Sequence, residues 1–355
     1  MWSNRLRPRV LPVLFTRPDM PAKLSRMSFS GILIEKTDTG TTARLTRLDE
    51  ADLPPGEVTV RVAYSTLNYK DALAIHNRAP VVRTFPMVPG VDLAGTVETS
   101  TAPAFAPGDA VFLNGQGVGE TRWGGLAQKA RVPASLLLRI PAPLTPASCM
   151  AIGTAGYTAM LCVNALERAG VTPAAGDVLV TGASGGVGGF AVLLLAARGF
   201  RVIASTGRLA ETGYLQSLGA AEVIDRAALA APGKPLQKER WAAAVDTVGS
   251  HTLANVCAGA RYRGVVTACG MAQGLEFPST VAPFILRHVS LLGIDAVRTP
   301  RAEQEAAWAQ LAREIAPEKL ALLASEVPLA EAIPAAARLL DGQIRGRVVV
   351  KIPQE

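Results

Sequence analysis

The chain has 355 residues, 49% hydrophobic and 18% charged, values typical of an ordered globular protein with two domains. Its net charge of +7 is concentrated near the N-terminus, because residues 1–26 hold six basic side chains and one aspartate. The rest of the chain has no basic stripe with interleaved aromatic residues, which argues against nucleic-acid binding. No apolar stretch of transmembrane length lacks glycine or charge, so we expect a soluble, cytoplasmic protein without a membrane partner.

Residues 1–28 form an N-terminal extension that is rich in arginine and poor in acidic residues, as organelle transit peptides are. It has no signal-peptide core, because Pro12 and Pro18 interrupt its short apolar segment. A flexible leader or an upstream start codon explains the same composition, and we favour that interpretation.

Residues 29–150 predict a barrel-like β unit with proline and glycine turns. Residues 57–64 alternate with period two and predict a half-buried strand. Further strands are predicted at 30–34, 92–97, 109–113 and 126–132. This unit is expected to be the catalytic domain, completed by residues 323–355, because residues 348–352 read as a strand that returns to it.

Residues 151–322 have a different pattern, in which strands alternate with helices. A helix is predicted over 152–169 and another over 301–314. The strands between them are expected at 178–181, 201–206, 222–225, 243–248, 264–269 and 291–296. Such βα repeats predict an α/β, doubly wound parallel sheet of the Rossmann type.

The turn between the first of these strands and its helix, residues 181–188 with the sequence TGASGGVG, matches the dinucleotide fingerprint. Ala183, Gly185 and Gly188 stand at its three glycine positions. They allow a tight turn, close approach of the backbone to a pyrophosphate, and close packing of helix on strand. The amides at the helix N-terminus then face the phosphates. We therefore expect a dinucleotide cofactor.

The end of the second strand indicates which dinucleotide binds. An NAD site places Asp or Glu there to accept a hydrogen bond from the ribose, whereas residues 205–208 are Ser-Thr-Gly-Arg. Arg208 is suited to a 2′-phosphate, and Arg226 at the end of the next strand is a second candidate. The sequence therefore predicts NADPH.

Together, the β unit, the glycine turn and the nucleotide domain resemble the medium-chain dehydrogenases/reductases, with a GroES-like barrel and a Rossmann domain. Zinc-dependent members carry a cysteine three residues before an aspartate, and a Gly-His-Glu triplet. Here Asn68 precedes Asp71, and Val91 stands between Gly90 and Asp92. Because no thiolate or imidazole ligand remains, no zinc site is expected. The four cysteines form no CxxC pair and are interpreted as packing residues.

Several segments, among them 65–75, 85–92 and 152–156, are similar to the NADPH-dependent acrylyl-CoA reductases. The resemblance implies reduction of the double bond of acryloyl-CoA to propionyl-CoA, with hydride reaching the β-carbon and a proton the α-carbon. It also makes a homodimer the expected assembly, since that state is common in the family. One alternative is a quinone or broad enone reductase on the same scaffold. The other is a binding scaffold without turnover.

Candidate catalytic residues come from the loop at 68–71 and from the strand after it. Tyr69 is a candidate proton donor or cofactor contact, and Asn68 could bind the nicotinamide or the substrate carbonyl. Asp71 and Asp92 could orient these groups, and a purely structural role is the alternative for both. Met271 lies after the fifth strand, where the nicotinamide should lie, and Ile285 and Ala296 follow from the family pattern. The expected cofactor-binding residues are Tyr69, Ser184, Gly185, Gly186, Val187, Thr206, Gly207, Arg208, Arg226, Met271, Ile285 and Ala296.

Overall fold

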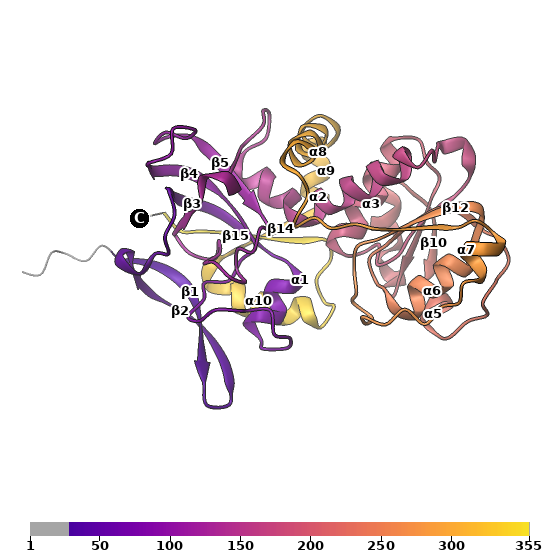
Figure 1. The fold of residues 1–355 in the computed structure, drawn as a ribbon, viewed down its shortest axis with the longest axis horizontal. Coiled ribbons are helices and arrows are strands. Elements are labelled where there is room, and N and C mark those ends of the chain that lie inside the picture. The colour runs from indigo at the N-terminus through magenta and orange to yellow at the C-terminus, as the bar shows by residue number, and fades with distance from the viewer. Residues whose placement is uncertain (1–27, 355) are drawn as a thin grey trace, which may run out of the picture.

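The computed structural model describes residues 28–354, which fold into two lobes joined by a long helix (Figure 1). The N-terminal part of the chain and the C-terminal strand build one lobe. The middle of the chain builds the other. The expectations about residues 1–27 lie outside the described residues.

The nucleotide lobe contains a six-stranded parallel sheet in the order β10-β9-β8-β11-β12-β13. This is the order of a dinucleotide-binding Rossmann fold, and it confirms the predicted fold class. Each predicted strand is present, with ends shifted by up to four residues. The strands are β8 (Val178–Val180), β9 (Val202–Thr206), β10 (Ala220–Asp225), β11 (Trp241–Asp246), β12 (Ala260–Ala268) and β13 (Ser290–Gly293).

Both faces of this sheet are buried, because alternate residues of each central strand enter different cores. Val178 and Val180 of β8 face one core, whereas Leu179 between them faces the other. Helices on opposite faces of the sheet cover the two cores (Figure 1). The helices of this lobe are α3 (Gly186–Ala197), α4 (Thr212–Ser217), α5 (Ala227–Ala230), α6 (Ser250–Gly259), α7 (Ala282–Leu286), α8 (Arg301–Glu314) and α9 (Pro317–Leu323).

The other lobe is built on a seven-stranded sheet in the order β14-β15-β3-β4-β5-β7, with β6 paired to β3. Pairing is antiparallel except between β14 and β15. The C-terminal strand therefore returns to the first lobe. A separate two-stranded hairpin completes the lobe, together with two helices, α1 and α10, that contact one another. Its elements are β1 (Ser28–Thr37), β2 (Gly40–Asp49), β3 (Val58–Leu67), α1 (Tyr69–Ile75), β4 (Asp92–Ser100), β5 (Ala110–Asn114), β6 (Lys129–Val132), β7 (Leu138–Arg139), β14 (Ala324–Pro328), α10 (Ala332–Leu340) and β15 (Arg347–Lys351).

Helix α2 (Pro146–Arg168) joins the lobes and begins six residues before the predicted helix. Its backbone breaks at Gly153, where φ is +52°. It is the one helix within residues 28–354 that is long and apolar enough to cross a membrane, but 89% of its most apolar window is buried inside the protein. The same helix packs against both sheets, so one continuous core runs from Phe112 in the barrel to Val245 in the nucleotide sheet.

Candidate active site

The glycine turn lies between β8 and the N-terminus of α3, as predicted. Gly182 has φ of +58°, which glycine adopts without strain. At Gly188, a Cβ atom would lie 2.3 Å from the carbonyl oxygen of Gly182, so only glycine permits this packing. Helix α3 begins at Gly186. The unpaired amides of its first turn and its dipole together suit a phosphate.

The end of β9 carries hydroxyl groups and no carboxylate. The side chains of Ser184 and Thr206 lie 2.8 Å apart and share a hydrogen bond between the turn and the strand. The guanidinium of Arg208 donates to the carbonyl oxygens of Gly342 and Ile344 at 2.9 and 2.8 Å. It also donates to Ser184 O at 3.0 Å, so this arginine fastens the segment before β15 to the glycine turn.

The other predicted cofactor residues lie at three places around the sheet. Arg226 packs over Gly207, where a Cβ atom would meet its Nε at 2.4 Å. Met271 and Ile285 are exposed on the nucleotide lobe. Ala296 lies beside Gly115 of the barrel, because its carbonyl oxygen is 3.9 Å from a Cβ built there. Gly207 and Arg226 thus lie at the carboxyl end of β9, and Ala296 lies where the two lobes meet.

The loop 68–71 begins helix α1, which sequence analysis did not predict. Tyr69 is the first residue of the helix and is 47% exposed. The amide of Asn68 is, by contrast, fully engaged. Its Nδ2 donates to Thr66 Oγ1 at 3.0 Å and to Asp92 Oδ2 at 2.8 Å, and its Oδ1 accepts from Arg347.

Asp92 is a fully buried carboxylate that accepts several hydrogen bonds. Its Oδ2 accepts from Thr66 Oγ1, Asn68 Nδ2 and Thr154 N, at 2.8 to 3.0 Å. Its Oδ1 accepts from Asn114 Nδ2 at 2.9 Å and from Thr154 Oγ1 at 2.5 Å. A carboxylate with this many donors holds three strands and the break in α2 together. These contacts favour the structural alternative for Asp92 over direct contact with substrate.

Asp71 is also buried, and it accepts from the backbone N–H groups of Asn68 and Val91 at 2.8 and 2.9 Å. Burial raises its pKa from 3.8 to about 7, and the charge of Asp92 acts in the same direction, while the two backbone bonds oppose the shift. Asp71 thus ties the start of α1 to the loop before β4.

The raised pKa makes the stability of the protein depend on pH. Between pH 3.8 and about 7 the folded protein binds a proton at Asp71 that the unfolded chain releases. The contribution of Asp71 to the free energy of unfolding is therefore complete below pH 3.8 and is lost as the pH rises through 7. Because Asp71→Asn does not titrate, the stability advantage of the wild type over it should shrink by on the order of 4 kcal/mol from pH 4 to 8. Urea unfolding at several pH values measures this difference.

Asp38→Asn is the matched control for this comparison, since Asp38 is exposed near the tip of the β1–β2 hairpin. It should change the free energy of unfolding little at any pH. An Asp71→Asn difference that stays constant from pH 4 to 8 would contradict the assignment.

Comparison with known proteins places this arrangement in a family. The chain is 49% identical over 321 residues to the probable acrylyl-CoA reductase AcuI of Escherichia coli, covering 90% of this chain and 99% of the relative. It is 46% identical to the acrylyl-CoA reductase AcuI of Ruegeria pomeroyi, covering 91% and 99% of the two chains. The chain belongs to the acrylyl-CoA reductase family. Within the medium-chain dehydrogenases/reductases this is the group that the sequence resembled.

A solved structure agrees with this membership. The yhdH oxidoreductase from Salmonella enterica, in complex with NADP, superposes with a TM-score of 0.89 at 49% identity, covering 92% of this chain and all of that chain. Family models for an alcohol dehydrogenase GroES-like domain and a zinc-binding dehydrogenase match residues 54–142 and 186–314. The GroES-like and Rossmann fold prediction is thereby confirmed.

The residues at the zinc positions do not fit the metal named in the second family description. Asn68 has its amide engaged by protein partners, and the side chain of Val91 is apolar. Among residues 28–354 no group of three or more histidine, cysteine or acidic side chains could hold a metal ion. We therefore assign no step to zinc.

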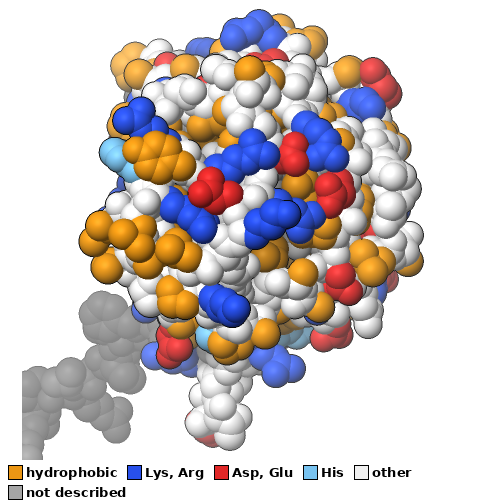
Figure 2. Space-filling view, turned by 90° about the vertical axis from the view of Figure 1, so that its right-hand side faces the viewer, with side chains coloured by type: hydrophobic (Ala, Val, Ile, Leu, Met, Phe, Trp, Pro, Cys, Tyr) orange, Lys and Arg blue, Asp and Glu red, His pale blue; other side chains and the backbone are white. Residues whose placement is uncertain are grey.

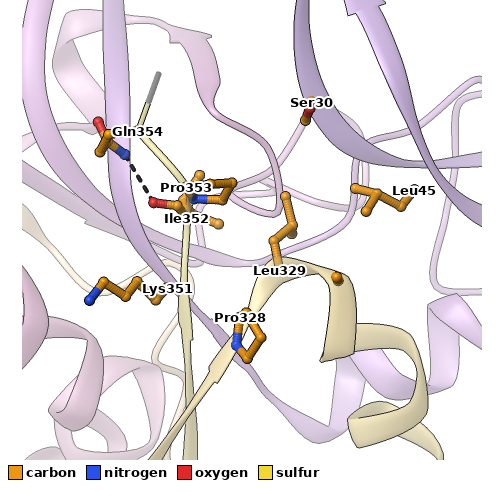
Figure 3. Close-up of a pocket in the computed structure, with 9 residues that line it drawn as sticks. Ser30, Leu45, Pro328, Leu329, Lys351, Ile352, Pro353 and Gln354 are labelled. Carbon is orange, nitrogen blue, oxygen red and sulfur yellow. Dashed lines mark hydrogen bonds between the residues drawn. The ribbon is translucent and has the colours of Figure 1, made fainter.

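The site includes residues that sequence analysis missed, above all Thr154 and Arg347. A strand at 348–352 was predicted, but its register was not. The structure pairs Val348 with Leu67, which brings Arg347 next to Asn68. Two surface hollows lie elsewhere. One of about 590 Å³ is lined by Leu45, Leu329 and the chain end from Lys351 to Gln354 (Figure 3), and one of about 850 Å³ lies between β7 and α8.

Proposed function

We propose that this protein reduces the carbon–carbon double bond of acryloyl-CoA with NADPH and gives propionyl-CoA. The observation that carries the proposal is its 49% identity, over nearly the whole relative, to a probable acrylyl-CoA reductase. The glycine turn, the absence of a carboxylate at the end of β9 and the exposed Tyr69 support it. The 2′-phosphate of NADPH is consistent with the arginines that lie near this strand end.

Bound NADPH supplies the hydride that adds to the β-carbon of the acryloyl group. Negative charge then collects on the thioester oxygen, and a hydrogen-bond donor at that oxygen lowers the barrier. We place the hydroxyl of Tyr69 in this role or in delivering the proton to the α-carbon, because Tyr69 is 47% exposed, whereas Lys70 next to it pairs with Glu120. We assign Asn68 and Asp92 to holding this loop in place, since their polar atoms are engaged within the protein.

An acceptor screen with NADPH tests the substrate. Acryloyl-CoA, crotonyl-CoA and a benzoquinone are supplied in turn, NADPH oxidation is followed by absorbance, and the product is identified by mass spectrometry. Acryloyl-CoA should be reduced with the highest kcat/KM. Faster reduction of the quinone would overturn the substrate assignment. Binding of NADPH with no turnover of any acceptor would favour the alternative of a binding scaffold without catalytic activity.

Cofactor choice can be tested at Arg208. The Arg208→Ala variant is expected to weaken the binding of NADPH by about 1.5–3 kcal/mol, because it loses a charged contact with the 2′-phosphate. A smaller loss should be common to both cofactors, because the same guanidinium fastens the 342–344 segment to Ser184. Titration of protein fluorescence with NADPH and with NADH measures both losses. Equal weakening of the two cofactors would contradict the phosphate contact.

We further propose that the protein is a cytoplasmic homodimer. Strand β13 is the edge of the nucleotide sheet, and within the described residues its outer side is unpaired. Figure 2, which looks onto this end of the molecule, shows hydrophobic side chains gathered beside basic and acidic ones. A second copy of the chain would cover these side chains. Sedimentation velocity measures the mass of the particle in solution and should give that of two chains. The segment that ends in α7 has several exposed apolar side chains, namely Leu275, Phe277, Val281, Ile285 and Leu286.

A further inference from the structure

Arg347, the first residue of β15, is a buried cation whose position needs a physical explanation. It is 3% exposed, and burial lowers its pKa, while the negative charges of Asp92 and Asp71 act in the opposite direction. Its Nη1 donates to Asn68 Oδ1 at 2.8 Å, and its Nη2 lies 3.6 Å from Asp92 Oδ2. Within residues 28–354, Nε and Nη2 make no hydrogen bond. Because unpaired buried donors cost free energy, a contribution to folding stability does not by itself explain why a cation lies here.

The backbone of Gly346, directly before Arg347, contacts the glycine turn. Gly346 N–H donates to Ser184 O at 3.0 Å, and Gly346 forms an isolated β-bridge with Gly185. The side chain then runs past the start of α3, because a Cβ atom at Gly186 would lie 2.9 Å from Cδ of Arg347. One residue therefore reaches from the dinucleotide turn to the loop that carries Tyr69.

A glycine in the break of α2 makes room for the guanidinium. A Cβ atom at Gly153 would lie 2.3 Å from Nη2 of Arg347 and 2.9 Å from Asp92 Oδ2. The next residue, Thr154, donates from both its backbone and its hydroxyl to Asp92. The break in the helix thus brings together the carboxylate, the guanidinium and the amide of Asn68.

We propose that Arg347 is a positioning residue, which holds Asn68, and with it the start of helix α1, against the dinucleotide turn. Tyr69 follows Asn68 directly, so the guanidinium sets where the Tyr69 hydroxyl lies relative to a bound nicotinamide. The proposal rests on the reductase function proposed above. Small errors in the placement of a reacting group lower rates by up to about 100-fold, whereas binding of the rest of the cofactor is preserved.

The test compares Arg347→Met, which keeps the length without the charge, with Arg347→Lys, Asn68→Ala and the double variant Arg347→Met/Asn68→Ala. Arg347→Met should lower kcat for acryloyl-CoA roughly 10- to 100-fold and leave the Kd of NADPH within about threefold. Arg347→Lys should recover a large part of kcat. The double variant should lose no more than the worse single variant, because both changes remove one interaction.

Lys351→Met is the matched control, since Lys351 lies at the exposed end of the same strand and pairs with Glu326. It should keep kcat within about twofold. Hydrogen exchange of residues 68–75 in the protein without substrate gives a readout independent of turnover. Exchange there should be faster in Arg347→Met and unchanged in Lys351→Met.

Parallel loss of kcat, NADPH affinity and melting temperature in Arg347→Met would show a merely structural role and overturn the proposal. Additive effects of the two substitutions, or unchanged exchange at 68–75, would do the same. If Arg347→Met does not fold, Asn68→Ala, which removes the same contact, decides by the split between kcat and the Kd of NADPH. If the wild type reduces a quinone but not acryloyl-CoA, only the substrate assignment is overturned. The role of Arg347 is then tested by hydrogen exchange and by kcat with the quinone.

Discussion

Replacing Asp92 with asparagine should destabilise the protein by about 3–5 kcal/mol and abolish most of its reductase activity. Asp92 is fully buried, and its two oxygens accept from Thr66, Asn68, Asn114 and both donors of Thr154. In asparagine, an amide nitrogen takes the place of one oxygen and turns N–H groups toward donors in either orientation. The variant also removes the carboxylate charge that lies 3.6 Å from Arg347 Nη2.

Urea unfolding and NADPH oxidation with acryloyl-CoA measure the two effects. Asp109→Asn is the control, because Asp109 forms a surface ion pair with Arg139 at 2.8 Å. That variant should lose at most about 1 kcal/mol and keep its activity. A loss of less than about 1 kcal/mol in Asp92→Asn would mean that the buried network does not depend on the charge.

The nucleotide lobe was predictable because its signals are local. The strand before the glycine turn is apolar on both faces, and the turn residues have a steric purpose that sequence spacing reveals. The predicted helix at 301–314 matches α8 at both ends. The strand ends were predicted less accurately, since β12 begins at Ala260, four residues before the predicted start. Tertiary pairing decides where a strand ends.

The barrel lobe was predicted less completely because its order depends on contacts distant in sequence. Helix α1 has only seven residues, too few for a clear helical period, and is held at its start by Asp71. The β2 strand of the hairpin is largely exposed and polar, so it carries no strong alternation. The contact of Arg347 with Asn68 follows from a strand register across 279 positions, which no local pattern encodes.

The same limit applies to the chemistry of the site. Asn68 was a candidate for binding the nicotinamide or the substrate carbonyl, and Asp71 and Asp92 were candidates for orienting these groups. The structure joins these three residues in one network, in which Asn68 and Asp92 are saturated by protein donors and acceptors, whereas the fourth candidate, Tyr69, is exposed. An asparagine and a guanidinium thus stabilise the loop in a protein that has no metal ligands at these positions.

Gly188→Ala is expected to weaken NADPH binding at least roughly 100-fold, because the methyl group meets backbone that cannot move aside. The added Cβ would lie 2.3 Å from the carbonyl oxygen of Gly182 and 2.7 Å from Cα of Ala183. Helix α3 must then shift away from the turn, and its first amides lose their positions for the pyrophosphate. Core packing of α3 is lost at the same time, so the melting temperature should also fall.

Gly213→Ala separates this steric effect from the general effect of alanine. Gly213 lies in helix α4 of the same lobe, and a Cβ atom there would have no neighbour within 4 Å. Because alanine is favoured over glycine in a helix by up to about 1 kcal/mol, this variant should be as stable as the wild type or more stable, with unchanged NADPH affinity. Fluorescence titration with NADPH and thermal unfolding compare the two variants. Normal NADPH affinity in Gly188→Ala would mean that the turn does not hold the cofactor, since the clash with the Gly182 carbonyl leaves α3 no way to keep its place.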